Sequence, residues 1–216
     1  MKNKGKYIVA TCIMLSVIFA GTVYASSYYS QANAKLNHLE SSFIKNYLGS
    51  KNLPAFRQYL ADAKNLTNRV TNTSDKRKLN NRIVQCENVI VTTEHVVNME
   101  TSMDKNYRGP KNLPAFKSYL DRVNSSLGTV SNKTIHQKLS ERSYAGANVI
   151  RDITVVDSVE YKRALVELNN AIELINSDRV AEGREKAREG LSLAYKVSTS
   201  FAKDALVAEF KDIINL

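Results

Sequence analysis

Apolar residues recur along this chain at alternating steps of three and four. The clearest stripe lies in residues 113–130 and consists of Leu113, Phe116, Leu120, Val123, Leu127 and Val130. Residues 53–70 follow the same spacing, and residues 180–197 repeat it with smaller side chains such as Gly183 and Ala187. This spacing places the apolar side chains on one face of a helix. It therefore predicts amphipathic helices that pack against neighbouring helices.

The other stripes predict where the remaining helices lie. We expect them at about 27–47, 75–107, 134–176, 180–198 and 201–215. At about 1.5 Å per residue, the second would be roughly 48 Å long and the third roughly 65 Å. Helices of that length do not fit one globular core. We therefore expect an all-α fold of elongated tandem three-helix bundles, joined by long shared helices, at residues 27–90, 91–150 and 151–216.

The expectation of tandem bundles is supported by an internal duplication. Residues 45–104 align without a gap on residues 105–164, and 22 of the 60 positions are identical. A degenerate third copy follows at a shift of 67 residues from the second. Such a repeat is the sequence signature of stacked structural units.

Residues around the start of the 53–68 and 113–127 stripes favour helix boundaries there. Asn52 and Asn112 are expected to cap the helices, because their side-chain oxygens accept bonds from first-turn amides. The prolines after them, Pro54 and Pro114, fit the first turn. Gly49 and Gly109 are expected to be left-handed residues just past the preceding helix.

Two segments rich in β-branched residues locally favour strands. They are NVIVTT at 88–93 and NVIRDITVV at 148–156. No partner strand or hairpin turn is evident nearby, and an isolated pair of strands is marginal in stability. We therefore expect both segments to be helical.

The first 25 residues have the order of an export signal. Three lysines precede an apolar run at 7–20, and Val23 and Ala25 are the small residues of a signal-peptidase site. An uncleaved membrane anchor is the alternative, because residues 7–25 approach the ~20 that span a bilayer. Lipidation at Cys12 is disfavoured by the Thr11 before it. In each case we expect the rest of the chain outside the cytoplasmic membrane, either secreted, wall-associated or anchored.

Composition argues against an enzyme. The chain has only 8 Gly and 3 Pro, no Trp, two Cys and three His. The histidines, His38, His95 and His136, lie far apart with no nucleophile pattern beside them. Cys86 falls on an apolar stripe and is expected to be a small buried residue that Gly146 replaces in the second copy. We expect no catalytic residues, no cofactor and no metal. One cysteine in the exported part excludes an internal disulfide, which is typical of a Gram-positive surface protein.

The formal net charge is +10, and the positive surplus lies in the two similar copies. Residues 45–104 carry nine basic and six acidic groups, residues 105–164 eleven and five, and residues 165–216 seven and nine. A basic face outside the cell favours an anionic polymer as partner, and tyrosines beside the basic groups can stack on sugars. The candidate ligand-binding residues are Lys45, Tyr47, Lys51, Arg57, Tyr59, Lys105, Tyr107, Arg108, Lys111, Lys117 and Tyr119. Half-burial of Tyr59 and Tyr119 against the helices is the alternative interpretation.

The segments SDRVAEGREKA at 177–187 and FAKDAL at 201–206 resemble the helical N-terminal region of SbsC-type S-layer proteins. Asn52-Leu53 and Asn112-Leu113 resemble a loop of the same region, and the likeness extends over about 27–216. The resemblance implies triple-helical bundles joined by contiguous helices, which attach to a secondary cell-wall polymer through basic and aromatic residues. No long β-rich part, which builds the lattice in that family, occurs in these 216 residues.

Two functions follow as hypotheses. The first is a non-enzymatic envelope protein that binds an anionic cell-wall polymer. The second is a membrane-anchored helical scaffold that binds another envelope protein, with residues 7–25 retained. Neither requires nucleic acid as a partner, and a membrane is involved only through residues 7–25 if they are not cleaved.

Overall fold

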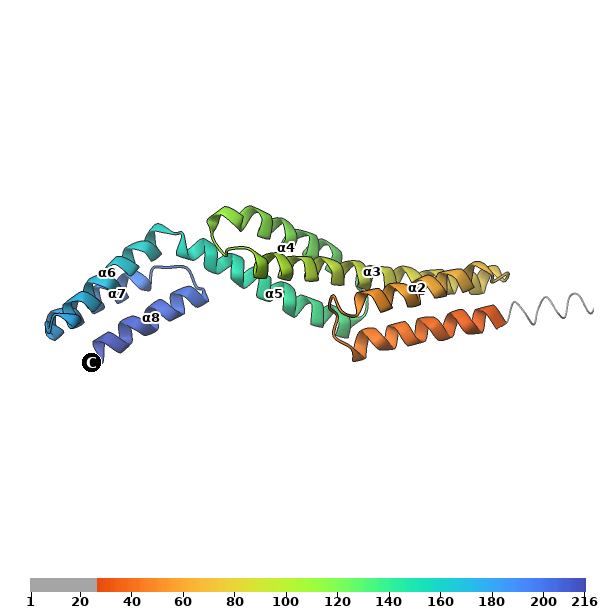
Figure 1. Ribbon diagram of the computed structural model, residues 1–216, viewed down its shortest axis with the longest axis horizontal. Helices are drawn as coiled ribbons and strands as arrows, with labels where there is room; N and C mark the ends of the chain where they lie inside the picture. The colour runs from red at the N-terminus through yellow and green to blue at the C-terminus, as the bar shows by residue number, and fades with distance from the viewer. Residues whose placement is uncertain (1–26) are drawn as a thin grey trace, which may run out of the picture. The chain divides into compact units, whose positions relative to one another are not determined.

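The computed structural model describes residues 27–216, so the predicted signal or anchor at residues 1–25 lies outside the described part. The first described helix covers residues 27–45. The helices after it are α2 (Leu53–Asn68), α3 (Thr73–Lys105), the short 3-10 helix η1 (Pro110–Asn112), α4 (Leu113–Leu127), α5 (Lys133–Val156), α6 (Val159–Asn176), α7 (Val180–Ala194) and α8 (Phe201–Ile214) (Figure 1). Residues 27–216 contain no strand, and the predicted all-α class is confirmed.

Both segments rich in β-branched residues are helical, as expected. Residues 88–93 lie in α3 and residues 148–156 in α5. The hydroxyls of Thr92, Thr93 and Thr154 donate to carbonyls four residues earlier, at 2.8, 2.7 and 2.8 Å. Burial of neighbours such as Val89 and Ile90 outweighs the local strand preference, because that preference is weak and depends on context.

The single helix expected at 134–176 is wrong. α5 ends at Val156, and α6 begins at Val159. Ser158 has an extended backbone, and its Oγ accepts a hydrogen bond at 3.2 Å from the Tyr161 amide. Glu160 adds a negative charge to the first turn of α6, where the helix dipole favours it. A serine cap therefore interrupts an apolar stripe that continues across the break.

The chain divides into two compact units. Unit 1 contains the described residues up to Val97 together with Ser125–Leu139, and unit 2 contains Asn98–Asn124 and Ser140–Leu216. Helices α3, α4 and α5 each contribute residues to both units. The division into bundles at 27–90, 91–150 and 151–216 stays a prediction.

In unit 1, the 27–45 helix, α2 and the first part of α3 bury apolar stripes against one another. The rings of Phe43 and Phe56 meet edge to face, with centroids 5.0 Å apart. Cys86 is 1% exposed, which confirms its expected burial. Burial raises the pKa of its thiol to about 12, so this thiol remains protonated at neutral pH.

In unit 2, small residues allow close helix packing. The predicted stripe of α7 is buried at Gly183, Ala187, Gly190 and Ala194. A Cβ on Gly190 would lie 2.3 Å from a ring carbon of Phe210, so α7 and α8 approach too closely for a larger residue. Gly146 similarly leaves room for the side chain of Met99. The fully buried Phe116 of α4 belongs to the same unit.

The duplication recurs in the side-chain interactions. Arg82 forms an ion pair with Glu40 in unit 1, with Nη2 2.8 Å from Oε2. Arg142 forms the same pair with Glu100 in unit 2, with a separation of 2.5 Å. Each arginine and each glutamate of the second pair lies 60 residues after its counterpart. The duplication therefore preserved a cross-helix contact as well as an apolar pattern.

Candidate functional site

The two copies of the repeat contain the same loop, at residues 46–52 and 106–112, which we call the tyrosine loops. The first follows the 27–45 helix, and the second follows α3. In each loop a glycine amide donates to the carbonyl of the tyrosine two residues earlier, from Gly49 to Tyr47 at 3.0 Å and from Gly109 to Tyr107 at 2.9 Å. Sequence identity at these positions therefore corresponds to the same backbone conformation.

The asparagine that ends each loop does not cap the following helix as expected. Asn52 occupies the cap position of α2, but its side chain makes no hydrogen bond to the first turn. Its Nδ2 instead donates to the Tyr47 carbonyl at 2.8 Å, and Asn112 donates to the Tyr107 carbonyl at the same distance. These side chains therefore hold the loop rather than the helix. The proline expected in the first turn of α2, Pro54, is there.

The expectation of left-handed glycines in the loops is also wrong. Within residues 27–216 no glycine has a positive φ, and Gly109 is extended at φ −140° and ψ 174°. The glycines are required by close contact instead. A Cβ would lie 2.4 Å from Cε1 of Tyr47 on Gly49 and 2.2 Å from Cε1 of Tyr107 on Gly109. Each tyrosine ring therefore lies directly against the backbone of its glycine.

The rings of the loop tyrosines are nevertheless open to solvent. Tyr47 is 66% exposed and Tyr107 80% exposed. Lysines flank both rings in sequence: Lys45 and Lys51 in unit 1, Lys105 and Lys111 in unit 2. All four are exposed, and the described part of the chain provides no ion pair for any of them. Each loop thus combines an aromatic face with uncompensated positive charge.

Other predicted site residues of unit 1 have structural partners. The guanidinium of Arg57 contacts one carboxylate oxygen of Glu94 through Nε at 2.9 Å and Nη2 at 2.6 Å. Tyr59 is half-buried, with its ring centroid 4.5 Å from that of His38 and 5.5 Å from Nζ of Lys35. These contacts join α2 to neighbouring helices. They leave Arg57 and Tyr59 less suited to binding a ligand than the loop residues.

The same distinction holds in unit 2. Arg108 donates to the Met103 carbonyl at 3.1 Å and to Asp104 at 3.0 Å. Tyr119 is half-buried, and the guanidinium carbon of Arg122 lies 5.8 Å from its ring centroid. Lys117 is exposed on α4. The loop tyrosine and its two flanking lysines are therefore the least engaged of the predicted residues.

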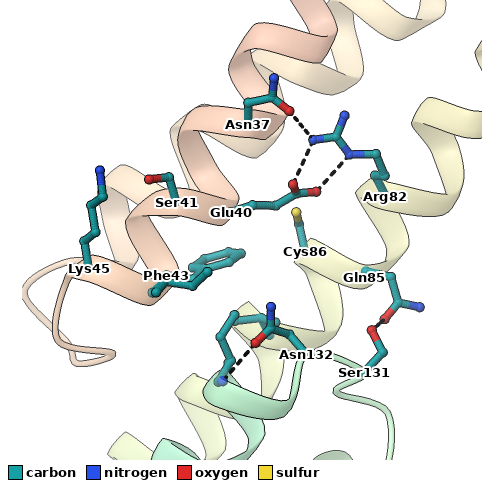
Figure 2. A pocket seen from close by; sticks show the side chains of 13 residues that line it. Asn37, Glu40, Ser41, Phe43, Lys45, Arg82, Gln85, Cys86, Ser131 and Asn132 are labelled. Atoms are coloured by element: carbon teal, nitrogen blue, oxygen red, sulfur yellow. Dashed lines mark hydrogen bonds and ion pairs between the residues drawn. The ribbon is translucent and has the colours of Figure 1, made fainter.

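A pocket that the sequence did not indicate lies in unit 1. It has a volume of about 550 Å³ and is bounded by the C-terminal part of the 27–45 helix, by α3 and by the turn that precedes α5. Its apolar lining consists of Phe43, Ile44, Cys86, Val89 and Ile135, and its polar lining of Asn37, Glu40, Ser41, Lys45, Arg82, Gln85, Ser131 and Asn132. In Figure 2 the side chains of Phe43 and Cys86 point into the space between the 27–45 helix and α3.

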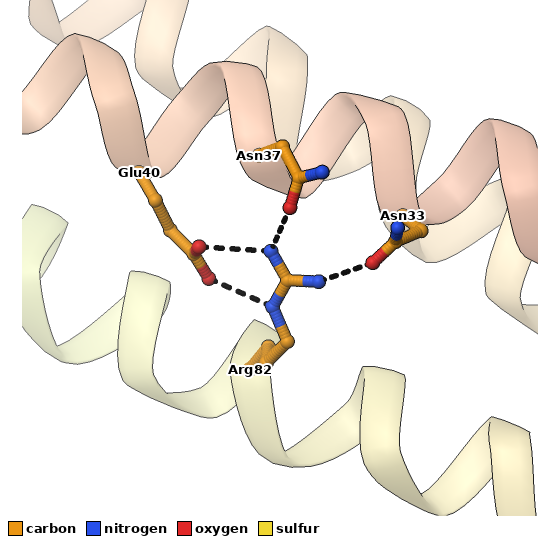
Figure 3. A network of polar contacts seen from close by, with 4 residues as sticks. All are labelled: Asn33, Asn37, Glu40 and Arg82. Carbon is orange, nitrogen blue, oxygen red and sulfur yellow. Dashed lines mark hydrogen bonds and ion pairs between the residues drawn. The ribbon is translucent and has the colours of Figure 1, made fainter.

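One wall of the pocket is held by a network around Arg82 (Figure 3). The guanidinium donates to both carboxylate oxygens of Glu40, at 2.9 and 2.8 Å, and also to Asn33 and Asn37. The bond to Glu40 raises the pKa of Arg82 further above its ordinary value. Because every guanidinium nitrogen has an acceptor, this arginine orders the wall and offers little to a ligand.

The chemistry available elsewhere in residues 27–216 is limited. No group of three or more His, Cys, Asp and Glu side chains in that part of the chain could hold a metal ion. His95 pairs with Ser126, Nδ1 to Oγ, at 3.1 Å, and His38 stacks on Tyr59. None of the helices in residues 27–216 is long and apolar enough to cross a bilayer.

Comparison of the chain with family models, with curated proteins and with solved structures gives no match. The likeness to SbsC-type proteins therefore stays a prediction from residues 177–206 and the two asparagine-leucine loops. The tyrosine loops and the unit 1 pocket are the features from which a function can be inferred.

Proposed function

We propose that this chain is a non-enzymatic cell-envelope protein that binds an anionic wall polymer through its two tyrosine loops. The observation that carries the proposal is the repeated loop geometry. Both loops hold an exposed tyrosine ring against a glycine, and both place lysines without intramolecular ion pairs beside it. A ring that is 66% or 80% exposed adds little to the stability of the fold, because stabilisation by an apolar surface depends on its burial.

The chemistry of the loops fits a charged polysaccharide. A tyrosine face stacks on the apolar face of a sugar, and its hydroxyl can exchange hydrogen bonds with sugar hydroxyls. An adjacent ammonium group attracts phosphate or carboxylate substituents. A ring held in place by the backbone loses little conformational freedom on binding, which reduces the entropic cost of association. Two loops on one chain would also bind a repeating polymer more tightly than one.

The proposal assigns binding to Lys45, Tyr47, Lys51, Lys105, Tyr107 and Lys111. Lys117 could extend the positive surface of unit 2. The other predicted residues would contribute less, because ion pairs or ring contacts within the protein already engage them. Export rests on the segment at 1–25, which predicts an extracytoplasmic location.

The finer prediction of tandem three-helix bundles joined by shared helices is part of the proposal. Helix α3 has 33 residues and contributes to both units, as a shared helix should. Packing among α6, α7 and α8 around Ala164, Leu168 and Phe210 supports a bundle near the C-terminus. Solution scattering on residues 26–216 tests this prediction, and the profile of one compact sphere would contradict it.

Sedimentation with purified sacculi tests polymer binding directly. Residues 26–216 should bind sacculi that retain their accessory polymer, should bind less as salt concentration rises, and should lose binding when the polymer is extracted. Tyr47→Ala combined with Tyr107→Ala should reduce the bound fraction at least tenfold, since stacking at two sites is lost.

The matched control is Tyr144→Ala combined with Tyr195→Ala. These tyrosines are also exposed, at 61% and 56%, but lie outside the tyrosine loops. They should leave sacculus binding unchanged. Equal losses from both pairs, or binding that survives polymer extraction, would contradict the proposal. A mature protein that retains residues 7–25 and binds no polymer would favour the anchored scaffold.

A further inference from the structure

The unit 1 pocket has the size and lining of a small-molecule site. Its volume of about 550 Å³ falls within the ~300–1,000 Å³ typical of ligand pockets. Phe43, Cys86, Val89 and Ile135 form an apolar floor whose side chains are otherwise buried in the unit 1 core. An aliphatic chain or ring is the chemistry that such a floor favours.

The charges at the rim are unequal. Glu40 and Arg82 neutralise each other within the wall network, whereas Lys45 is exposed and forms no ion pair with residues 27–216. The carbonyl of Ile44, at the C-terminal end of the 27–45 helix, accepts a hydrogen bond at 2.6 Å from Nζ of Lys138. The negative end of that helix is therefore already neutralised on this side.

A second source of positive potential is the start of α5. The pocket is lined by Ser131 and Asn132, which directly precede this 24-residue helix. Asn132 caps the helix by accepting from the Ile135 amide at 3.1 Å. Helix N-termini favour negative charge. Together with Lys45, this end of α5 makes the pocket complementary to an anionic group attached to an apolar body.

We infer that the unit 1 pocket binds a single-chain amphiphile with a carboxylate headgroup. The aliphatic chain lies against Phe43, Val89 and Ile135, and the carboxylate lies at the rim near Lys45. Amide and hydroxyl groups of Gln85, Ser131 and Asn132 line the same opening and provide donors for carboxylate oxygens. This ligand and this pocket differ from the polymer and the tyrosine loops, so the inference does not depend on the proposed function.

Calorimetric titration of residues 26–216 with monomeric octanoate, decanoate and dodecanoate tests the aliphatic part. Each methylene buried in the pocket should tighten binding about fourfold. Dodecyltrimethylammonium, which has the same chain and the opposite charge, should bind at least tenfold more weakly than dodecanoate. Equal affinity for the two headgroups, or no gain from octanoate to decanoate, would overturn the inference.

Ser41→Trp fills the pocket from the 27–45 helix and should abolish dodecanoate binding. Thr101→Trp, the same change at the equivalent position of the second copy, should leave it intact. If Ser41→Trp does not fold, as judged by circular dichroism, Lys45→Glu replaces it, with Lys105→Glu as its control. Lys45→Glu should weaken binding about three- to tenfold. Equal effects of a variant and its control would overturn the assignment of the ligand to this pocket.

Vesicles of phosphatidylglycerol distinguish a free amphiphile from a membrane lipid. Dodecanoate should bind whether or not vesicles are present, and vesicles alone should not retain the protein. Retention by vesicles without dodecanoate binding would overturn the inference in favour of a membrane surface. Ser41→Trp should leave sacculus binding unchanged, so a failure of the pocket inference is distinguishable from a failure of polymer binding.

Discussion

Truncation of Phe116 to alanine should destabilise unit 2 severely. Phe116 is 0% exposed, and its apolar stripe on α4 faces the core. Loss of a buried phenyl ring removes its transfer free energy and leaves a cavity, which together cost about 3–5 kcal/mol. That is a large part of the ~5–15 kcal/mol that stabilises a typical domain. For a unit of roughly 100 residues, the melting temperature should fall by at least about 12 °C.

The measurement is urea unfolding of residues 26–216 followed by circular dichroism. Phe201→Ala is the matched control, because Phe201 is 66% exposed at the start of α8 in the same unit. We expect that control to change the free energy of unfolding by less than about 1 kcal/mol. If Phe116→Ala costs no more than Phe201→Ala, the helix face assigned to the core is wrong.

Three further predictions concern local features. Gly49→Ala with Gly109→Ala should displace the tyrosine rings and weaken sacculus binding, while urea unfolding changes little, because Gly109 has an ordinary extended backbone; a large loss of stability would contradict this. Ser158→Ala should cost about 0.5–2 kcal/mol by removing the cap of α6, and unchanged unfolding would show that the cap is dispensable. Because burial raises the pKa of Cys86 from 9.0 to about 12, the thiol contributes stability fully below pH 9. This contribution is lost as the pH rises from 9 toward 12. The difference in unfolding free energy between the parent protein and Cys86→Ala, measured across that range, should shrink, and a constant difference would refute the shift.

Local sequence signals were sufficient for most of the helices. The three- and four-residue steps at 53–70, 113–130 and 180–197 place side chains on helix faces that the structure buries. The β-branched segments were correctly expected to be helical because no partner strand was near. The helix predicted over 134–176 failed at one point, since periodicity reports a buried face and not a break in the backbone. Ser158 followed by Glu160 was the signal that could have located that break.

Residue types in the tyrosine loops were identified correctly, but their roles were not. Asn52 and Asn112 have the composition of helix caps, yet each bonds to a carbonyl of its own loop. Gly49 and Gly109 have the position of left-handed residues, yet each is required by contact with a ring. Composition states what a residue can do, and the positions of neighbouring atoms determine which option is used.

The sequence by itself determined the helical class, the duplication and the apolar faces, because all three depend on residues close together in the chain or on direct comparison of two copies. The pocket depends on three segments, residues 37–45, 82–89 and 131–135, that no local pattern connects. The pairing of Arg82 with Glu40 joins residues 42 positions apart. Only the tertiary structure decided which charges are neutralised and which remain available, because that depends on distances across helices and not along them.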